Sequence, residues 1–347
     1  MDFAARVVRW QRQHGRHDLP WQGTRDAYRV WLSEIMLQQT QVATVALYYG
    51  RFLARFPDVG SLAAAPEDDV LALWSGLGYY ARARNLHHAA REVATRFGGV
   101  FPTTFDDLVA LPGIGRSTAS AIAAFSSGER RAILDGNVRR VIARHAGIAG
   151  DPSVTAVAAR LWKEAEARLP DSGVEAYTQA MMDLGADICA PRRPACLLCP
   201  VAADCVARIE ERVAELPGKR ARAAPKRRRI AMLVVVSRGE VLLEKRPPTG
   251  IWGGLWSLPE ADAGESPAAA LAQWGMEAAE IQPLEPFAHA FTHFTLDVVP
   301  WRITPRRGAP LAADRPATWL SLADLAGAAL PAPVRKLLKR VAETAFK

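Results

Sequence analysis

From about Asp26 to Arg212, apolar residues recur mainly at the spacing of an α-helix, and Pro and Gly residues mark the breaks. Val70-Leu71-x-Leu73-Trp74 and Leu108-Val109-x-Leu111 are two examples of this spacing. Residues three and four positions apart share one face of a helix, so each segment has an apolar face that can be buried. This part of the chain is therefore predicted to be all-α.

The pattern changes after Leu216-Pro217-Gly218. The continuous apolar run Ile230–Val236 is typical of a buried strand, Ser237-Arg238-Gly239 of a turn, and Val241–Leu243 of a second strand. We therefore predict that a β-hairpin opens a different domain.

Further strand-like segments and a helix complete the predicted C-terminal domain. Phe291–Val299 and Trp301–Thr304 are typical of strands, and an Ala-rich segment before Trp274 is typical of a helix, so this part is α+β. No internal repeat is visible. The predicted domains are a helical domain at residues 1–215, a basic linker at 216–228 and an α+β domain at 229–347.

A chain of 347 residues that is 50% hydrophobic has enough apolar material for about two domains. Its formal charge of +8 is local, because seven Lys or Arg and no acid lie between Lys219 and Arg229, and the rest of the chain sums to about +1. Such a run is compatible with a nuclear address, a nucleic-acid contact or a solvated linker. The first residues include Arg6, Arg9 and Arg12 and no long apolar segment, so we expect a cytoplasmic protein that does not enter a membrane.

The cysteines form one cluster with the pattern C-x6-C-x2-C-x5-C. They are Cys189, Cys196, Cys199 and Cys205. Close spacing in a helical, cytosolic chain favours a metal site over disulfides. Zinc sites usually have two short cysteine pairs, whereas this set has one, so the spacing favours a [4Fe–4S] cluster, with zinc as the alternative. Arg192 and Arg193 lie inside the loop, either as phosphate contacts or as ordinary solvated side chains.

Residues 104–126 are predicted to form two helices with a Gly-rich turn between them. Thr104 is the expected N-cap of the first, the turn is Leu111-Pro112-Gly113-Ile114-Gly115, and the second follows from Arg116. Glycines let the backbone approach another surface closely, and the amides at the positive end of a helix suit a DNA phosphate. The motif is therefore a candidate helix-hairpin-helix, although a tight turn without a ligand has the same pattern.

Two acidic residues stand in apolar surroundings. Glu34 is the only acid in Val30–Leu37, and burial would raise its pKa so that it could donate a proton to a base nitrogen. A glutamate on the helix surface is the alternative. Asp135 precedes Gly136-Asn137, where it can also simply cap a helix. A protonated acid and a retained carboxylate together suit cleavage of a glycosidic bond.

These motifs resemble the endonuclease III superfamily of helix-hairpin-helix glycosylases, through L-P-G-I-G-R-S-T-A at residues 111–119, L-D-G-N-V at 134–138 and the cysteine set. Within it, the chain resembles the MutY adenine DNA glycosylase family. The distinguishing strings are W-L-S-E-I-M-L-Q-Q-T-Q-V at 31–42, G-L-G-Y-Y-A-R-A-R-N-L at 76–86 and Q-A-M-M-D-L-G-A at 179–186. The resemblance spans nearly the whole chain. It implies a helical glycosylase of two lobes, one carrying a [4Fe–4S] cluster, followed by a Nudix-like domain.

The resemblance also implies a reaction. The chain would excise adenine opposite 8-oxoguanine or guanine from duplex DNA in base excision repair, as a nucleoid-associated monomer. Adenine must first leave the stack. Glu34 would then protonate N7, Asp135 would stabilise or trap the oxocarbenium ion, and Asn137 would orient these groups. Gly113 and Gly115 would contact the DNA backbone.

Other residues are assigned by resemblance to the lesion side and to the outcome of the reaction. Gln39, beside Leu37, would enter the helix, and Tyr79 would stack next to 8-oxoguanine. Core packing and an ordinary surface amide are the simpler interpretations of these residues. Ser117 stands at the DNA-facing position where bifunctional relatives have a Schiff-base lysine, so we expect a monofunctional glycosylase that leaves an abasic site.

The segment Trp252–Pro259 resembles the residues that precede the catalytic helix of Nudix hydrolases. The R-E-x-x-E-E carboxylates are missing, because Ala261–Gly275 offers only Asp262 and Glu265. We therefore expect a domain that reads 8-oxoguanine without hydrolysing nucleotides. Phe291-Thr292-His293 resembles the family's F-S-H loop, in which Thr292 keeps a hydroxyl and His293 would sense the lesion. A plain loop histidine is the alternative.

Three other functions compete with this interpretation. A bifunctional pyrimidine-lesion glycosylase would need lysine at position 117 and would lack the C-terminal domain. A non-enzymatic iron–sulfur protein that binds DNA would not need Glu34 and Asp135 together. A Nudix enzyme fused to a binding module would need the missing carboxylates.

Overall fold

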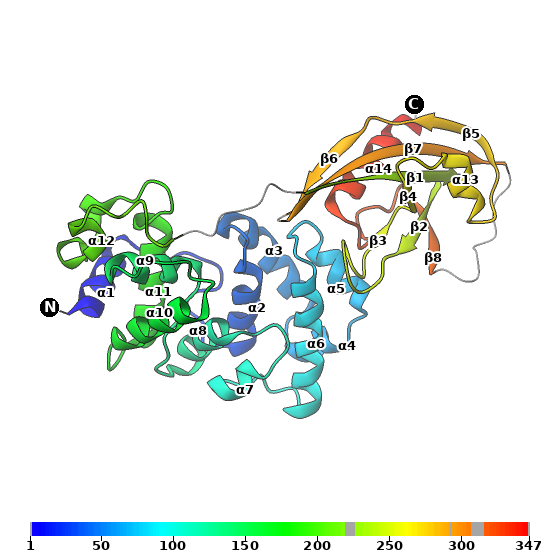
Figure 1. The fold of residues 1–347 in the computed structure, drawn as a ribbon. Helices are drawn as coiled ribbons and strands as arrows, with labels where there is room; N and C mark the ends of the chain where they lie inside the picture. Colours follow the sequence, from blue (N-terminus) through cyan, green and yellow to red (C-terminus); the bar gives the residue numbers. More distant parts are fainter. Residues whose placement is uncertain (1, 219–225, 292, 307–315, 346–347) are drawn as a thin grey trace. The chain divides into compact units, whose positions relative to one another are not determined.

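The computed structural model describes residues 2–218, 226–291, 293–306 and 316–345 (Figure 1). Its contacts divide the chain into two compact units, Met1–Ala64 with Asn85–Ala221 and Ala65–Arg84 with Arg222–Lys347. The stretch 65–84 therefore packs with the C-terminal part of the chain, although its neighbours in sequence belong to the helical unit.

The first unit is helical, as predicted, and contains most of α6. Its helices are α1 (Phe3–His14), α2 (Ala27–Leu37), α3 (Val42–Arg55), α4 (Val59–Ala64), α6 (Ala81–Arg96), α7 (Phe105–Val109), α8 (Arg116–Ser127), α9 (Gly136–His145), α10 (Thr155–Ala167), α11 (Val174–Asp183) and α12 (Val206–Ile209). A π-helical turn, η1 (Leu184–Ile188), and two 3₁₀ turns, η2 (Cys196–Leu198) and η3 (Ala202–Asp204), complete it.

Short polar side chains begin several of these helices. The Asp2 carboxylate accepts a hydrogen bond from the Ala5 amide at 2.8 Å, and Asp26 accepts one from the Tyr28 amide at 2.9 Å. Thr104 caps α7 by accepting from the amide of Asp107, which confirms the predicted N-cap. Each cap satisfies a helical amide that has no carbonyl partner within the helix.

Small residues let two helices of the active-site region pack closely. Helix α8 buries Ala119, Ala121, Ala123 and Ala124, and it packs against α2. It ends at Gly128, whose φ of 75° lies in the left-handed region that favours glycine at the end of a helix. Gly128 thus ends α8, and the small alanine side chains let the helix pack closely.

The second unit is α+β, as predicted. Its elements are α5 (Glu67–Trp74), β1 (Lys226–Ser237), β2 (Glu240–Lys245), β3 (Trp256–Ser257), β4 (Glu260–Asp262), α13 (Pro267–Ala272), β5 (Ala278–Pro283), β6 (Phe287–Ala290), β7 (Phe294–Pro305), β8 (Ala317–Ser321) and α14 (Ala332–Ala345). The strand order is β3-β2-β1-β7-β5, with β4, β6 and β8 pairing to β1, β7 and β2.

Strand β1 lies in the middle of this sheet. Its apolar run is buried from Ile230 to Val235, and it pairs in parallel with β7 and antiparallel with β2. The pairing of Val236 with Val241 confirms the predicted hairpin. The Ala-rich segment forms α13, and its Leu271 packs with Leu233 in the core of the unit, so this predicted helix is confirmed as well.

The sequence predicted two strands separated at Pro300, and this was wrong, because β7 continues through that residue. The Pro300 carbonyl accepts a hydrogen bond from the Leu284 amide at 2.9 Å. The carbonyl and the N–H of one residue in a strand point to the same side, so the N–H that Pro300 lacks would face that side as well. On that side β5 ends at Pro283 and β6 begins at Phe287. The missing donor therefore falls in a gap of the ladder, where proline is tolerated.

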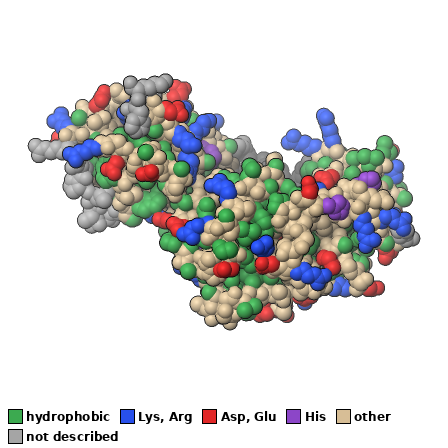
Figure 2. All heavy atoms as spheres, turned by 180° about the vertical axis from the view of Figure 1, so that it is seen from behind, with side chains coloured by type: hydrophobic (Ala, Val, Ile, Leu, Met, Phe, Trp, Pro, Cys, Tyr) green, Lys and Arg blue, Asp and Glu red, His purple; other side chains and the backbone are tan. Residues whose placement is uncertain are grey.

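Basic side chains are distributed over both units on the face shown in Figure 2. Part of the basic run belongs to β1, since Lys226 to Arg229 are exposed residues at the start of that strand. Arg227 donates to both carboxylate oxygens of Asp297, at 2.9 and 2.5 Å. The remaining basic residues of the run, Lys219, Arg220 and Arg222, lie outside the described residues.

Candidate active site

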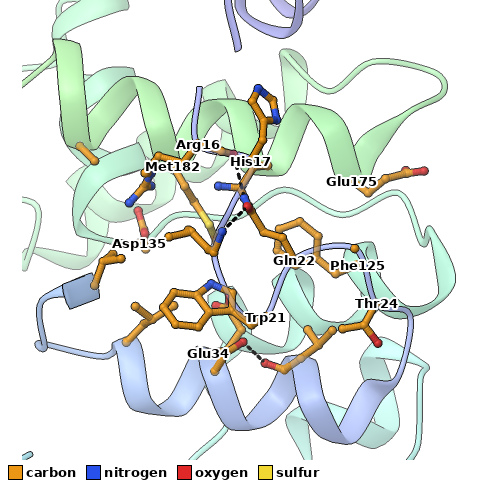
Figure 3. Close-up of a pocket in the computed structure, with 18 of the residues that line it drawn as sticks. Arg16, His17, Trp21, Gln22, Thr24, Glu34, Phe125, Asp135, Glu175 and Met182 are labelled. Atoms are coloured by element: carbon orange, nitrogen blue, oxygen red, sulfur yellow. Dashed lines mark hydrogen bonds between the residues drawn. The ribbon is translucent and has the colours of Figure 1, made fainter. Parts of the chain in front are cut away.

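A pocket of about 700 Å³ lies in the helical unit (Figure 3). Helix α2, helix α11, the start of α9 and the segment before α2 all contribute to its lining. The predicted residues Glu34, Leu37, Asp135 and Asn137 are among its lining residues. The fold therefore brings together acidic groups that lie about a hundred positions apart in the sequence.

Glu34 is the acidic residue of α2 that lines the pocket. Its neighbours Trp31, Leu32, Ile35 and Met36 are buried in the core. Burial raises the pKa of Glu34 to about 8, with a further contribution from the negative charge of Asp135. Glu34 therefore carries a proton near neutral pH and can donate it.

Asp135 is both the N-cap of α9 and a lining residue of the pocket. Its carboxylate accepts from the Val138 amide at 2.7 Å. Burial raises the pKa of Asp135, while the amides of Val138 and Asn137 and the charges of Arg140 and Arg139 lower it. The helix cap proposed as the alternative and the pocket carboxylate are thus the same group. These donors favour the ionised form of Asp135, and none of them acts on Glu34.

The hydroxyl of Ser117 is not among the residues that line the pocket. The Ser117 hydroxyl accepts a hydrogen bond from the Leu134 amide at 2.9 Å, and Leu134 directly precedes Asp135 in the chain. Ser117 lies in the first turn of α8, so this bond links the hairpin to the loop that presents the carboxylate. In this structure Ser117 therefore stabilises the segment that leads to Asp135.

Asn137 is held by an arginine that also reaches the cysteine loop. The Asn137 amide oxygen accepts from Arg140 Nη2 at 2.9 Å, and Arg140 Nε donates to the Cys189 carbonyl at 2.6 Å. A side chain at Gly185 would lie 2.6 Å from the Asn137 Cβ, so only glycine fits there. The π-helical turn η1 thereby packs directly against the start of α9.

The cysteine loop forms a second cavity, which is lined by all four cysteines and by Val141, Leu184 and Ile188. Arg144 also lines this cavity and is only 3% exposed. Its guanidinium donates to the carbonyls of Ala190 at 2.8 Å, Pro191 at 3.2 Å and Leu216 at 2.8 Å, and to Cys189 Sγ at 3.4 Å. The loop is therefore folded around a buried cation.

The donor set of this cavity is four cysteine thiols, which suit a soft metal centre. Burial, together with the charges of the other three cysteines, raises the pKa of the Cys199 thiol to about 11. Four thiolates side by side therefore require a compensating positive charge. In the part of the chain that the structure describes, no three His, Cys, Asp or Glu side chains are gathered as ligands of one metal ion.

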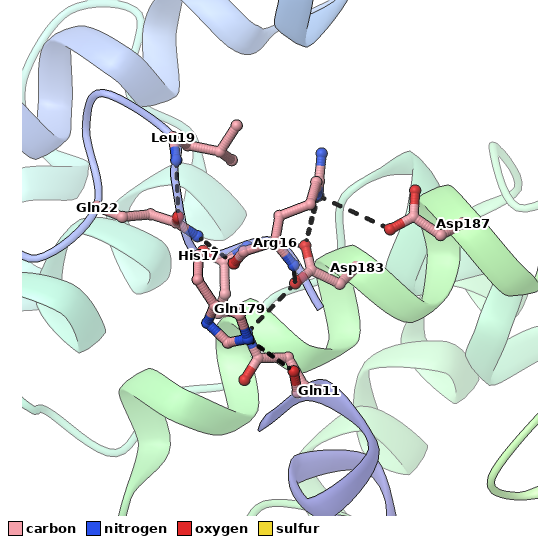
Figure 4. A network of polar contacts seen from close by, with 8 residues as sticks. All are labelled: Gln11, Arg16, His17, Leu19, Gln22, Gln179, Asp183 and Asp187. Carbon is pink, nitrogen blue, oxygen red and sulfur yellow. Dashed lines mark hydrogen bonds and ion pairs between the residues drawn. The ribbon is translucent and has the colours of Figure 1, made fainter. Parts of the chain in front are cut away.

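Sequence reasoning missed a polar network beside the pocket (Figure 4). Asp183 is fully buried and accepts from the Arg16 amide at 3.1 Å, from Arg16 Nε at 2.8 Å and from Gln179 Nε2 at 2.9 Å. Arg16 and Gln179 line the pocket. The signal in the sequence was an acid, Asp183, four positions after Gln179 on one face of α11. Its partner Arg16 lies 167 positions away, so the spacing could not reveal the contact.

The helix-hairpin-helix is present as α7 and α8. Gly113 has a φ of 78°, and a Cβ there would lie 2.8 Å from the Asn85 Cβ, so both conformation and space require glycine. Gly115 begins α8 with no side-chain cap. The amides at the start of α8 are thus left to a ligand or to solvent.

The residues assigned to the lesion side have unusual backbone conformations. Gln39 is exposed after α2 with a φ of 56°, and Tyr79 has a φ of 50°. Tyr79 is 46% exposed, which contradicts the interpretation that it packs in the core. Residues other than glycine rarely adopt positive φ, and such residues are enriched at functional sites.

In the second unit, His293 is exposed beside Phe294, and Thr292 lies outside the described residues. Sequence reasoning missed the ring cluster next to them. Phe291 stacks on Phe294 with centroids 4.6 Å apart and contacts His289 edge-on at 4.7 Å, and Trp252 lies 5.7 Å from Phe291. Burial lowers the pKa of His289, so the cluster is uncharged near neutral pH. The four rings thus form one aromatic cluster in the second unit.

Comparison with known proteins agrees with this arrangement. The family model of the HhH-GPD superfamily base excision DNA repair proteins matches residues 32–167, and that of the NUDIX domain matches 231–340. An adenine DNA glycosylase of Buchnera aphidicola is 34% identical over 99% of both chains, and that of Mus musculus is 33% identical over 97% of this chain and 77% of its own. A solved thermostable thymine-DNA glycosylase is 28% identical with a TM-score of 0.55, covering 60% of this chain and 95% of its own. No helix among the described residues is long and apolar enough to span a bilayer.

Proposed function

Because this chain belongs to the adenine DNA glycosylase family, we propose that it excises adenine opposite 8-oxoguanine, or opposite guanine, from duplex DNA. The observation that carries this proposal is the pair of unlike carboxyl groups in one pocket. Glu34 has a pKa of about 8, whereas amide and guanidinium groups favour the ionised form of Asp135. Burial also raises the pKa of Asp135, and the amides and arginines act against that rise. Glycosidic cleavage requires one carboxyl group that donates a proton and one that is ionised, and Glu34 and Asp135 suit these two roles.

The reaction follows from these two states. Glu34 donates its proton to N7 of the flipped adenine, so the base leaves with the electrons of the N-glycosidic bond as a neutral molecule. Positive charge develops on the sugar, and Asp135 stabilises it or forms a temporary bond with it. A water molecule then adds to C1′ and loses a proton, which leaves an abasic site. Asn137, held by Arg140, keeps the start of α9 in place.

The choice of adenine is explained by the Gln179 side chain. A carboxylate can only accept hydrogen bonds, so Asp183 fixes which end of the Gln179 amide faces it. Nε2 donates in this bond, at 2.9 Å (Figure 4), and Gln179 lines the pocket, so its Oε1 would be the atom that accepts from the flipped base. Adenine carries an amino group at C6, whereas guanine carries a carbonyl there. The orientation thus favours adenine and disfavours guanine.

The reaction should stop at the abasic site. Ser117 has a hydroxyl that is already bonded to the Leu134 amide, and a hydroxyl cannot form a Schiff base. Among the described residues, no lysine lines the pocket. Both facts support a monofunctional glycosylase.

The base opposite adenine is proposed to be contacted from both parts of the chain. The residues are Gln39, Leu37 and Tyr79, together with Phe291, Thr292 and His293. The positive φ of Gln39 and Tyr79 and the ring cluster beneath Phe291 support this assignment. The amides that follow Gly113 and Gly115 would bind phosphate. Such contacts fix register on the duplex without reading sequence.

Cys189, Cys196, Cys199 and Cys205 are proposed to hold a [4Fe–4S] cluster. When bound, the cluster would supply the positive charge that four buried thiolates need and would fold the loop that carries Arg192 and Arg193. The link from Cys189 through Arg140 to Asn137 supports a structural role for this loop near the active site. The protein would act on DNA as a monomer.

Single-turnover release of adenine tests the proposal. The substrates are duplexes with adenine opposite 8-oxoguanine, guanine or thymine, and alkali is added afterwards to reveal abasic sites. We expect rapid release opposite 8-oxoguanine, slow release opposite thymine, and strand breaks only after alkali. Glu34→Gln should keep duplex binding and slow release by about two to four orders of magnitude, as expected for loss of a general acid. Unchanged turnover in Glu34→Gln would remove the basis of the mechanism.

A further inference from the structure

The turn that joins α5 to α6 carries Tyr79 in a conformation that needs support. Gly76, Gly78 and Tyr79 have φ values of 109°, 73° and 50°. Residues other than glycine rarely adopt this conformation, so the surrounding structure must hold Tyr79 there.

Side chains within the turn supply part of this support. Trp74 Nε1 donates to the Gly78 carbonyl at 3.2 Å, and Arg82 Nη2 donates to the carbonyls of Leu77 and Gly78 at 3.3 and 3.2 Å. The Arg82 guanidinium lies 5.3 Å from the Trp74 ring and 5.6 Å from the Tyr79 ring. The turn is therefore tied to the end of α5 and presents the Tyr79 ring as a fixed surface.

The C-terminal part of the chain holds the end of α5. Ser75 Oγ donates to the Leu330 carbonyl at 2.7 Å and accepts from Arg335 Nη2 at 3.1 Å. Arg335, in the first turn of α14, also donates to the Ala328 carbonyl at 2.6 Å and the Ala326 carbonyl at 3.0 Å. Ser75 is thus one end of a hydrogen-bonded bridge to α14.

A second set of contacts holds the start of α5, which lies beside β3 in Figure 1. The Asp68 carboxylate accepts from Trp256 Nε1 at 3.1 Å and from the Lys245 ammonium group. The Lys245 nitrogen also lies 4.9 Å from the Trp256 ring. At the beginning of α6, Arg84 Nη1 donates to the Gly253 carbonyl at 2.5 Å. These bonds explain why 65–84 forms one compact unit with the C-terminal part.

We propose that Asp68 and Ser75 are positioning residues for recognition of the base opposite adenine. Through them the Nudix-like part of the chain holds α5 and fixes the Tyr79 ring, so that its influence on the lesion side is not limited to the loop at Phe291. This inference rests on the proposed function of Tyr79. It assigns neither Asp68 nor Ser75 a contact with DNA.

The test measures discrimination, which is the ratio of single-turnover adenine release opposite 8-oxoguanine to that opposite guanine. Ser75→Ala and Asp68→Asn are made in the full-length chain, alone and together with Tyr79→Ala. Glu277→Gln is the control, because it removes a carboxylate charge from an exposed ion pair with Arg306 in the same unit. Trp256→Phe removes only the indole donor to Asp68 and gives a second route if Asp68→Asn folds poorly.

We expect Ser75→Ala and Asp68→Asn each to lower discrimination roughly tenfold, as for the loss of one strong hydrogen bond. The loss should vanish in the Tyr79→Ala background, since residues that act through one group are not additive. Amide hydrogen exchange within residues 75–82 should accelerate in the same variants, and Glu277→Gln should change neither quantity. Unchanged discrimination, or an equal loss with and without Tyr79, would overturn the inference. If Tyr79→Ala itself discriminates like the wild type, the proposed role of Tyr79 fails instead and takes the inference with it.

Discussion

The proton on Glu34 determines how the reaction should depend on pH. Its pKa of about 8 means that Glu34 is protonated below that pH and loses its proton as the pH rises through that value. Asp135 must be ionised, and burial raises its pKa, so activity is also lost as the pH falls toward that raised value. We expect a bell-shaped profile of the single-turnover rate, whose alkaline limb lies near pH 8.

The alkaline limb depends on both carboxyl groups, because the negative charge of Asp135 raises the pKa of Glu34. Asp135→Asn should therefore lower the pH of the alkaline limb in whatever residual release remains, since Asp135 no longer raises the pKa of Glu34. DNA binding measured at the same pH values is the control. A rate that still rises between pH 8 and pH 10 would contradict the assignment of Glu34 as the acid.

Gln179 makes a prediction about the base itself. Gln179→Leu removes the Oε1 acceptor and should slow adenine release roughly 10- to 100-fold, the effect of losing a specific hydrogen bond to substrate. A duplex containing unsubstituted purine, which lacks the 6-amino group, provides the matched comparison. The wild type should release adenine faster than purine for this reason, and Gln179→Leu should lose that part of the difference. An equal effect on both bases would mean that Gln179 acts only through Asp183.

At this scale the sequence identified what local composition can show. Glu34 stands alone in an apolar helix, and Asp135 precedes a helix start, so both could be singled out. The sequence could not decide whether Asp135 is a cap or a pocket carboxylate, because in the structure it is both. The spacing of Gln179 and Asp183 was visible in the sequence, but their partner Arg16 was not, since it lies 167 positions from Asp183.

At the scale of elements, the cysteine loop depends on one buried side chain. Arg144→Gln would leave the carbonyls of Ala190, Pro191 and Leu216 without their donor, and an unsatisfied buried group costs about 1–3 kcal/mol. We expect a lower iron content per protein, weaker visible absorption and a lower Tm. Arg208→Gln is the control, because Arg208 is exposed and its guanidinium donates to the Ala202 carbonyl at the edge of the same loop. Full iron content in Arg144→Gln would contradict this role.

Element prediction succeeded where the pattern of one segment decides the outcome, and failed where a neighbour does. The hairpin of β1 and β2 and the cap at Thr104 are local, and both were predicted. The continuation of β7 through Pro300 was not, because it depends on the gap between β5 and β6. The packing of α5 with the C-terminal part depends on partners such as Trp256 and Arg335, far along the chain. The periodicity of α5 itself gives no indication of these partners.

At the scale of the whole molecule, the formal charge of +8 is small for 347 residues, so its placement matters more than its sum. The basic run was compatible with a nuclear address, a DNA contact or a solvated linker. Within the described residues, the part of that run in β1 is exposed, and Arg227 is already paired with Asp297. Arg228 and Arg229 are therefore the residues of the strand that can best distinguish a DNA contact from the other two interpretations.

The salt dependence of duplex binding decides between them. Each phosphate neutralised by the protein contributes about −0.9 to the slope of log Kobs against log salt. If both arginines contact DNA, Arg228→Gln with Arg229→Gln should make the slope shallower by about 1 to 2. Arg306→Gln is the control, an exposed arginine paired with Glu277. An unchanged slope would mean that the strand's basic end is solvated. The charge used for DNA would then have to come from elsewhere, with Arg192 and Arg193 of the cysteine loop the next residues to replace.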